Sequence, residues 1–137
     1  MKKKIILLFS VLLILVGCGR EAEEEQQVEQ VTTYAKFQSL DIQIDKNQII
    51  ITGEADASDN KFYYSVVQAE KEIGREKEVR VDKTWGKFII EIPIMKEMIN
   101  LDEVVIVNLY TRSSEGEIIN PNYVPIDLQL EMSEESE

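Results

Sequence analysis

Apolar and polar residues alternate with a period of two through much of this chain, which is the pattern of strands that have one buried face. Residues 40–45 alternate strictly, and residues 48–53 alternate again with Ile49 and Ile51 on one face. The two residues between these runs supply a turn. The pattern therefore predicts a β-hairpin in this part of the chain.

Five further segments continue the strand pattern toward the C-terminus. Aromatic and β-branched residues, which favour strands, fill residues 62–67, and the alternation over residues 87–92 places Phe88, Ile90 and Ile92 on one side. The remaining strands are predicted at residues 79–81, 104–110 and 124–130.

Two segments fit the strand pattern less well. Residues 67–80 carry alternating charges and are compatible with a strand or with a charged helix, although Gly74 disfavours the helix. Residues 93–101 begin with a proline that stops the preceding strand. They predict one helical turn whose apolar side chains face inward, namely Ile94, Met98 and Leu101.

About seven short strands within about 100 residues, separated by turn residues, are typical of an antiparallel β-sandwich. A small closed β-barrel is the alternative, because it also consists of short strands joined by turns. We therefore predict an all-β fold.

The first eighteen residues carry a targeting pattern. Three lysines follow Met1, an apolar run of about a dozen residues comes next, and Gly17 precedes the only cysteine of the chain, Cys18. These are the parts of a secretory signal peptide. The apolar run is too short for a transmembrane helix, which needs roughly 20 residues. An ordinary cleaved signal would leave one unpaired thiol in an exported protein, which is unusual.

The sequence Leu15-Val16-Gly17-Cys18 resembles the lipobox of bacterial lipoproteins. This resemblance implies cleavage before Cys18, thioether lipidation of its thiol, and attachment to the extracytoplasmic face of the cell membrane. Each buried methylene contributes about 0.8 kcal/mol, so two acyl chains give effectively permanent attachment, whereas one short chain gives only marginal binding.

The leader and the composition divide the chain into four predicted parts. Residues 1–17 form the signal peptide, residues 18–34 the lipidated cysteine with an acidic flexible tether, residues 35–130 the β-sandwich domain, and residues 131–137 an acidic tail. The tether has no apolar stripe that could bury a helix face. Random-coil scaling gives it a span of roughly 20 Å, which would hold the domain a short distance from the membrane.

The protein is acidic, with a formal net charge of -11 at pH 7. Loss of the three leader lysines would bring the mature chain to -14. Binding of phosphates by proteins depends on clusters of Lys and Arg, which the chain lacks after the leader lysines. We therefore expect no nucleic-acid partner, and no binding of the folded part to an anionic membrane surface.

The usual catalytic groups are missing from the sequence. There is no histidine, the one cysteine is the expected anchor, and no Gly-rich phosphate loop or Gly-x-Ser-x-Gly motif occurs. Two carboxylates can hydrolyse glycosides, and Asp82 and Glu91 are the acids to test, but they would have to lie in a cleft. A small sandwich has little room for a cleft, so we expect neither enzymatic activity nor a cofactor.

One loop gathers oxygen-bearing side chains, namely those of Asp56, Ser58, Asp59 and Asn60. A hard cation such as Ca²⁺ takes six to eight oxygen ligands, so this loop is a candidate metal site. The spacing lacks the distal Glu of an EF-hand loop, however, and a solvated turn is the favoured interpretation.

Four aromatic residues are candidates for an exposed face that binds a sugar or a peptide: Tyr63, Tyr64, Trp85 and Tyr123. Packing in the core or at a sheet edge is the alternative, because aromatic side chains bury large apolar areas. The alternating charges over residues 70–78 are interpreted as a solvated hairpin face or as a guard against edge-to-edge aggregation, with partner docking as the alternative.

Three segments together are similar to bacterial Ig-like modules of cell-surface proteins. They are residues 51–56, residues 81–93 with Trp85, and residues 105–116. The resemblance covers roughly residues 37–130 and implies an Ig-like β-sandwich of about seven strands in which the Trp packs against the sandwich. The chain differs in having Lys83 at the hairpin glycine position, a single module and no cysteine pair.

These features lead to a functional expectation. A lipid-anchored Ig-like module would act in the bacterial envelope by recognising a protein or an envelope polymer through strand edges and loops. The alternatives are a passive structural spacer and a binder of Ca²⁺ or another small ligand. Because sandwiches host many unrelated roles, the fold does not name the ligand.

Overall fold

The computed structural model describes residues 32–129 except residues 46, 83 and 101. The predicted signal peptide, Cys18, most of the tether and the acidic tail lie outside these residues. The elements are β1 (Ala35–Asp45), β2 (Gln48–Ala57), β3 (Lys61–Gln68), β4 (Lys71–Glu72), β5 (Lys77–Arg80), β6 (Gly86–Pro93), α1 (Lys96–Asn100), β7 (Val105–Arg112) and β8 (Ile118–Ile126).

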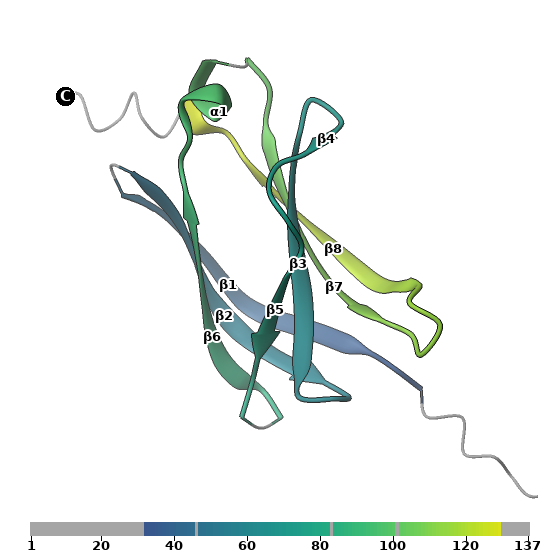
Figure 1. The fold of residues 1–137 in the computed structure, drawn as a ribbon. Coiled ribbons are helices and arrows are strands. Elements are labelled where there is room, and N and C mark those ends of the chain that lie inside the picture. Colours follow the sequence, from purple (N-terminus) through teal and green to yellow (C-terminus); the bar gives the residue numbers. More distant parts are fainter. Residues whose placement is uncertain (1–31, 46, 83, 101, 130–137) are drawn as a thin grey trace, which may run out of the picture. The chain divides into compact units, whose positions relative to one another are not determined.

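The strands form two antiparallel sheets that pack face to face (Figure 1). The first sheet has the order β1-β2-β6, and the second has the order β4-β3-β7-β8 with β5 also paired to β3. The chain changes sheet after β2, after β5 and again after β6. This distribution of strands is that of an antiparallel β-sandwich, and among the described residues no further strand pairs with β6 in the first sheet. As a result, β6 is an edge strand.

The core lies between the two sheets and follows directly from the alternation. Ile49 and Ile51 of β2 and Ile90 of β6 are almost fully buried, as are Val107 and Leu109 of β7 on the facing sheet. Three phenylalanine rings close one end of this core, with edge-to-face contacts of 4.9 Å between ring centroids for Phe62 with Phe37 and for Phe62 with Phe88. Such contacts stabilise the core beyond the area that they bury.

Several predictions are confirmed. The fold is an all-β sandwich and not a closed barrel, since the two sheets have separate edges. The hairpin of residues 40–53 forms within β1 and β2. The predicted helical turn is α1, where Met98 is 1% exposed and Ile94 packs against the core, while Leu101 lies outside the described residues.

Several segments differ from the prediction. Residues 67–80 contain the end of β3 and the short strands β4 and β5, so the helix alternative is wrong. Strand β2 continues through Asp56 to Ala57, because Ala55 and Ala57 face the core and pair with β1. Strand β8 begins at Ile118 and ends at Ile126, earlier than predicted at both ends, because it pairs with the whole length of β7.

Candidate functional site

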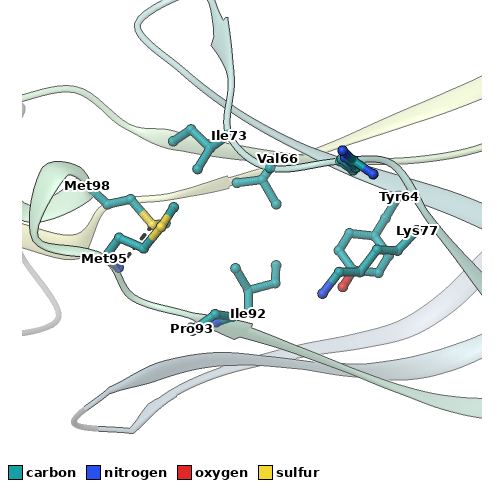
Figure 2. A pocket seen from close by; sticks show the side chains of 10 residues that line it. Tyr64, Val66, Ile73, Lys77, Ile92, Pro93, Met95 and Met98 are labelled. Carbon is teal, nitrogen blue, oxygen red and sulfur yellow. Dashed lines mark hydrogen bonds between the residues drawn. The ribbon is translucent and has the colours of Figure 1, made fainter.

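An apolar hollow of about 180 Å³ opens between the two sheets beside β6 (Figure 2). We call it the open-edge pocket. Its walls come from β3, from the end of β6, from the segment before and within α1, and from the connection between β4 and β5. The lining residues are Tyr64, Val66, Ile73, Gly74, Arg75, Lys77, Ile92, Pro93, Met95 and Met98.

The pocket forms where the segment that joins β4 to β5 has two more residues than the part of β3 that it runs beside. Both β4 and β5 pair with the same edge of β3, with Val67 opposite Glu72 and Tyr64 opposite Lys77. On β3, two residues lie between Tyr64 and Val67. On the partner side, four residues lie between Glu72 and Lys77. The two extra residues interrupt the ladder between β4 and β5, and Gly74 at a φ of 81° allows the turn within this interruption.

Helix α1 forms the methionine wall of the pocket, and a buried glutamine holds it in place. Gln68 is 2% exposed, and its Nε2 donates to the carbonyl oxygen of Met98 at 2.9 Å and to that of Glu103 at 2.8 Å. The backbone N–H of Met95 in turn contacts Sδ of Met98 at 3.4 Å. Gln68 of β3 thus holds the backbone at Met98, whose sulfur contacts the backbone of Met95.

The pocket has an apolar end and a polar end. Met95 and Met98 lie together at one end, while the amino group of Lys77 and the hydroxyl of Tyr64 lie at the other (Figure 2). Within residues 32–129 as described, the ion pairs of the protein are those of Lys61 and Arg80 with Glu78 and of Arg112 with Glu76. Arg75 and Lys77 take part in none of these ion pairs.

Strand β6 presents unpaired backbone groups next to the pocket. The N–H of Ile94 donates to the carbonyl oxygen of Asn47 at 2.8 Å, which makes these two residues a hydrogen-bonded pair of the antiparallel ladder. Hydrogen-bonded pairs recur at every second residue, so Ile92 and Ile90 also bond to β2. The N–H groups of Ile89 and Glu91 therefore point away from the sheet, toward the free edge.

The outer face of the second sheet carries a separate polar cluster. The guanidinium of Arg112 donates two bonds to Glu76, from Nε at 2.9 Å and from a terminal nitrogen at 2.5 Å, and the Tyr110 hydroxyl also donates to Glu76. The hydrogen bonds from Arg112 hold the pKa of Glu76 below its usual value, even though partial burial opposes this shift. Burial and the bond to Glu76 raise the pKa of Tyr110.

The structure places the four aromatic candidates on different faces and does not bring them together into one exposed face. Tyr63 and Tyr123 lie on the outer face of the second sheet, where Tyr63 stacks on Tyr110 with ring centroids 6.3 Å apart and Tyr123 is 65% exposed. Tyr64 points to the opposite face, is 7% exposed and lines the open-edge pocket. Trp85 is half-buried at the turn before β6, beside a different hollow.

The oxygen-bearing residues are engaged in local hydrogen bonds. Asp56 lies in β2 and accepts from the Tyr34 hydroxyl at 3.4 Å, while the Ser58 hydroxyl lies 3.2 Å from the Tyr34 nitrogen. Asp59 is exposed, and Asn60 adopts a φ of 54° in the turn that leads to β3. Among the described residues, no group of three or more Asp, Glu, His or Cys side chains is arranged to hold a metal ion. The calcium site stays a prediction.

The open-edge pocket was missed at the sequence level. Its residues are spread over four elements, and an alternation of acids and bases was the only local sign. In the structure, the acids and bases of this segment lie on opposite sides. Glu76 and Glu78 face outward to their basic partners. Arg75 and Lys77 line the pocket.

Comparison with protein-family models, with curated proteins and with solved structures gave no match. In the part of the chain that the structure describes, no helix is long and apolar enough to cross a membrane. Over the described residues, the structure defines a class, an all-β sandwich of eight strands in two open antiparallel sheets.

Proposed function

We propose that this protein is a lipid-anchored module of the bacterial cell envelope that binds an extended segment of a partner protein along β6. The lipobox-like sequence at Cys18 supports the anchor. The free edge of β6 beside the open-edge pocket supports the mode of binding, because an added strand would use both.

Strand addition needs a row of free backbone groups and pockets for alternate side chains. The N–H groups of Ile89 and Glu91 are the free backbone groups, and the open-edge pocket can accept a side chain. Lys87 and Glu91 place charges along this edge, which discourages nonspecific pairing with other strands. The edge therefore favours a selected partner over general aggregation.

The size of the pocket favours a single side chain as the group that enters it. Pockets for whole small-molecule ligands usually measure roughly 300–1,000 Å³, whereas a cavity of about 150 Å³ holds one benzene ring. At about 180 Å³, the open-edge pocket matches one aromatic or branched aliphatic side chain. A peptide can anchor such a side chain and gain the rest of its affinity from backbone pairing.

The test uses a photo-cross-linking amino acid in place of Met95, which is 41% exposed at the pocket. Irradiated cells should give one discrete protein adduct. Adding Glu91→Pro should abolish it, because proline removes an edge N–H without removing a bond to β2. The matched control is Ile118→Pro, which removes an outward N–H from β8, as shown by the bond from Ser113 N–H to the Glu117 oxygen.

Two results would contradict the proposal. One is an adduct at position 95 that survives Glu91→Pro unchanged. The other is the absence of an adduct both with the cross-linker at position 95 and, in a separate variant, with the cross-linker in place of the exposed Tyr123, which is what a passive spacer predicts. Thermal unfolding of both proline variants verifies that the sandwich remains intact.

A further inference from the structure

Building on the proposed function, we infer that the bound segment carries a large apolar side chain followed, two positions later, by an acidic one. The apolar side chain would lie against Met95 and Met98, and the carboxylate would lie near Lys77 and Arg75.

The first support is charge. The chain as a whole carries a formal net charge of -11, yet the charged residues that line this pocket are Arg75 and Lys77. Neither forms an ion pair with any residue that the structure describes. The neighbouring acids Glu76 and Glu78 already face Arg112, Lys61 and Arg80 on the other side of the segment. The two cations are therefore available to a ligand that brings its own carboxylate.

The second support is the separation of the two ends of the pocket (Figure 2). In an extended segment, side chains at positions i and i+2 point to the same side and lie roughly 6.6 Å apart. One of them can thus enter the methionine end while the next on that side approaches Lys77. The residue between them points away from the pocket.

The order of the two residues follows from the direction of β6. This strand runs toward Pro93 and leads into Met95, so its C-terminal end is the methionine end. A segment added antiparallel to β6 runs the other way and meets the methionines first. The expected sequence is therefore apolar, any residue, acidic, in the N-to-C direction.

Labelled heptapeptides test this with the purified lipid-free protein, read by fluorescence anisotropy. The probe Ser-Thr-Phe-Thr-Glu-Thr-Ser should bind about fivefold more tightly than the same peptide with Lys for Glu, since an exposed pair contributes up to about 1 kcal/mol. The shifted peptide Ser-Thr-Phe-Glu-Thr-Thr-Ser should lose the same factor. High salt should reduce the preference.

A charge swap provides the matched control. In the double variant Arg75→Glu, Lys77→Glu the preference should reverse in favour of the Lys peptide, whereas Lys36→Glu, on the distant strand β1, should change nothing. An unchanged preference in the double variant overturns the inference. So does tighter binding of dodecanoate than of any peptide, or no binding by the whole set.

The two proposals fail separately. If the adduct at position 95 depends on the β6 edge but the charge swap has no effect on peptide preference or on adduct yield, strand addition stands and the acidic motif is wrong. If the adduct is independent of the β6 edge, the proposed function itself is wrong.

Discussion

Glu76 accepts hydrogen bonds from two residues of β7. Arg112 and Tyr110 both lie on β7, and Glu76 precedes β5, so the cluster joins the charged segment to the middle of the second sheet across β3. The guanidinium also lies 5.4 Å from the centre of the Tyr110 ring. This cluster therefore fixes the position of the segment that carries Arg75 and Lys77.

The lowered pKa of Glu76 predicts a pH-dependent contribution to stability. Because the pKa of the folded state lies below the usual 4.5, the ionised carboxylate stabilises the protein above about pH 4.5, and this contribution is lost as the pH falls through the folded-state pKa. Glu76→Gln should lower the free energy of unfolding by about 0.5–1 kcal/mol at neutral pH. Urea unfolding should show that the difference between variant and wild type closes toward about pH 2.

The control for Glu76 is Glu115→Gln, which changes an exposed carboxylate in the turn before β8. This variant should follow the wild type at every pH. A difference for Glu76→Gln that stays constant from neutral to acidic pH would show that the loss comes from packing and not from the carboxylate charge.

At the scale of the elements, the turn between β3 and β4 explains why residues 67–80 were ambiguous. Ala69 and Glu70 form a two-residue hairpin loop, and both have positive φ, at 53° and 59°. This is the geometry of a type I′ turn, which usually carries Asn-Gly. Alanine and glutamate are good helix formers, so the local sequence favours the wrong structure and the pairing with β3 overrides it.

The same turn gives a prediction with a definite sign. The double variant Ala69→Asn, Glu70→Gly should raise the free energy of unfolding by about 1 kcal/mol, because a left-handed conformation costs an ordinary residue about 1–2 kcal/mol and glycine avoids most of that cost. Chemical denaturation measures the change. Ala69→Val is the opposite control and should destabilise, since a β-branched residue tolerates positive φ poorly. A double variant that is less stable than the wild type would contradict the assigned turn.

The elements that the sequence predicted well are those whose signal is local. Strict alternation in β2 and β6 reports directly on which side chains are buried, and Ile49, Phe88 and Ile90 are buried as expected. In β1 the same alternation is less informative, because Leu40 and Ile42 are 39% and 38% exposed. Pro93 ends β6 and a single helical turn follows it. In these segments propensity, pattern and tertiary pairing agree.

The open-edge pocket could not be predicted in this way, because it depends on relations between distant segments. The two extra residues opposite β3 become visible only when the registers of β4 and β5 are both known. The methionine wall depends on Gln68, which reaches a helix 30 residues away in the sequence. The absence of a strand beyond β6 among the described elements is likewise a property of the sheet and not of any one segment.

At the scale of the whole molecule, the acidic character and the two pocket cations have complementary effects. A high net negative charge limits nonspecific association with other acidic proteins and surfaces. In the proposed binding mode, a local pair of cations beside an apolar pocket favours segments that carry an acidic residue two positions after an apolar one. Specificity of this kind combines one attraction with a general repulsion.

The predicted anchor at Cys18 determines where such binding takes place, and it can be tested apart from the fold. Cys18→Ala should abolish fatty-acid labelling and partitioning into the detergent phase, because the thioether cannot form without the thiol and the remaining apolar run is too short to span a membrane. Gly19→Ala, which leaves Leu15 to Cys18 intact, should be labelled normally. Retained labelling in Cys18→Ala would refute the anchor.

The purified Cys18→Ala protein should still bind the probe peptide as the wild type does, since the residues of the pocket and of the β6 edge all lie within the sandwich. Loss of the cellular adduct with retained peptide binding would therefore separate placement at the membrane from recognition by the domain.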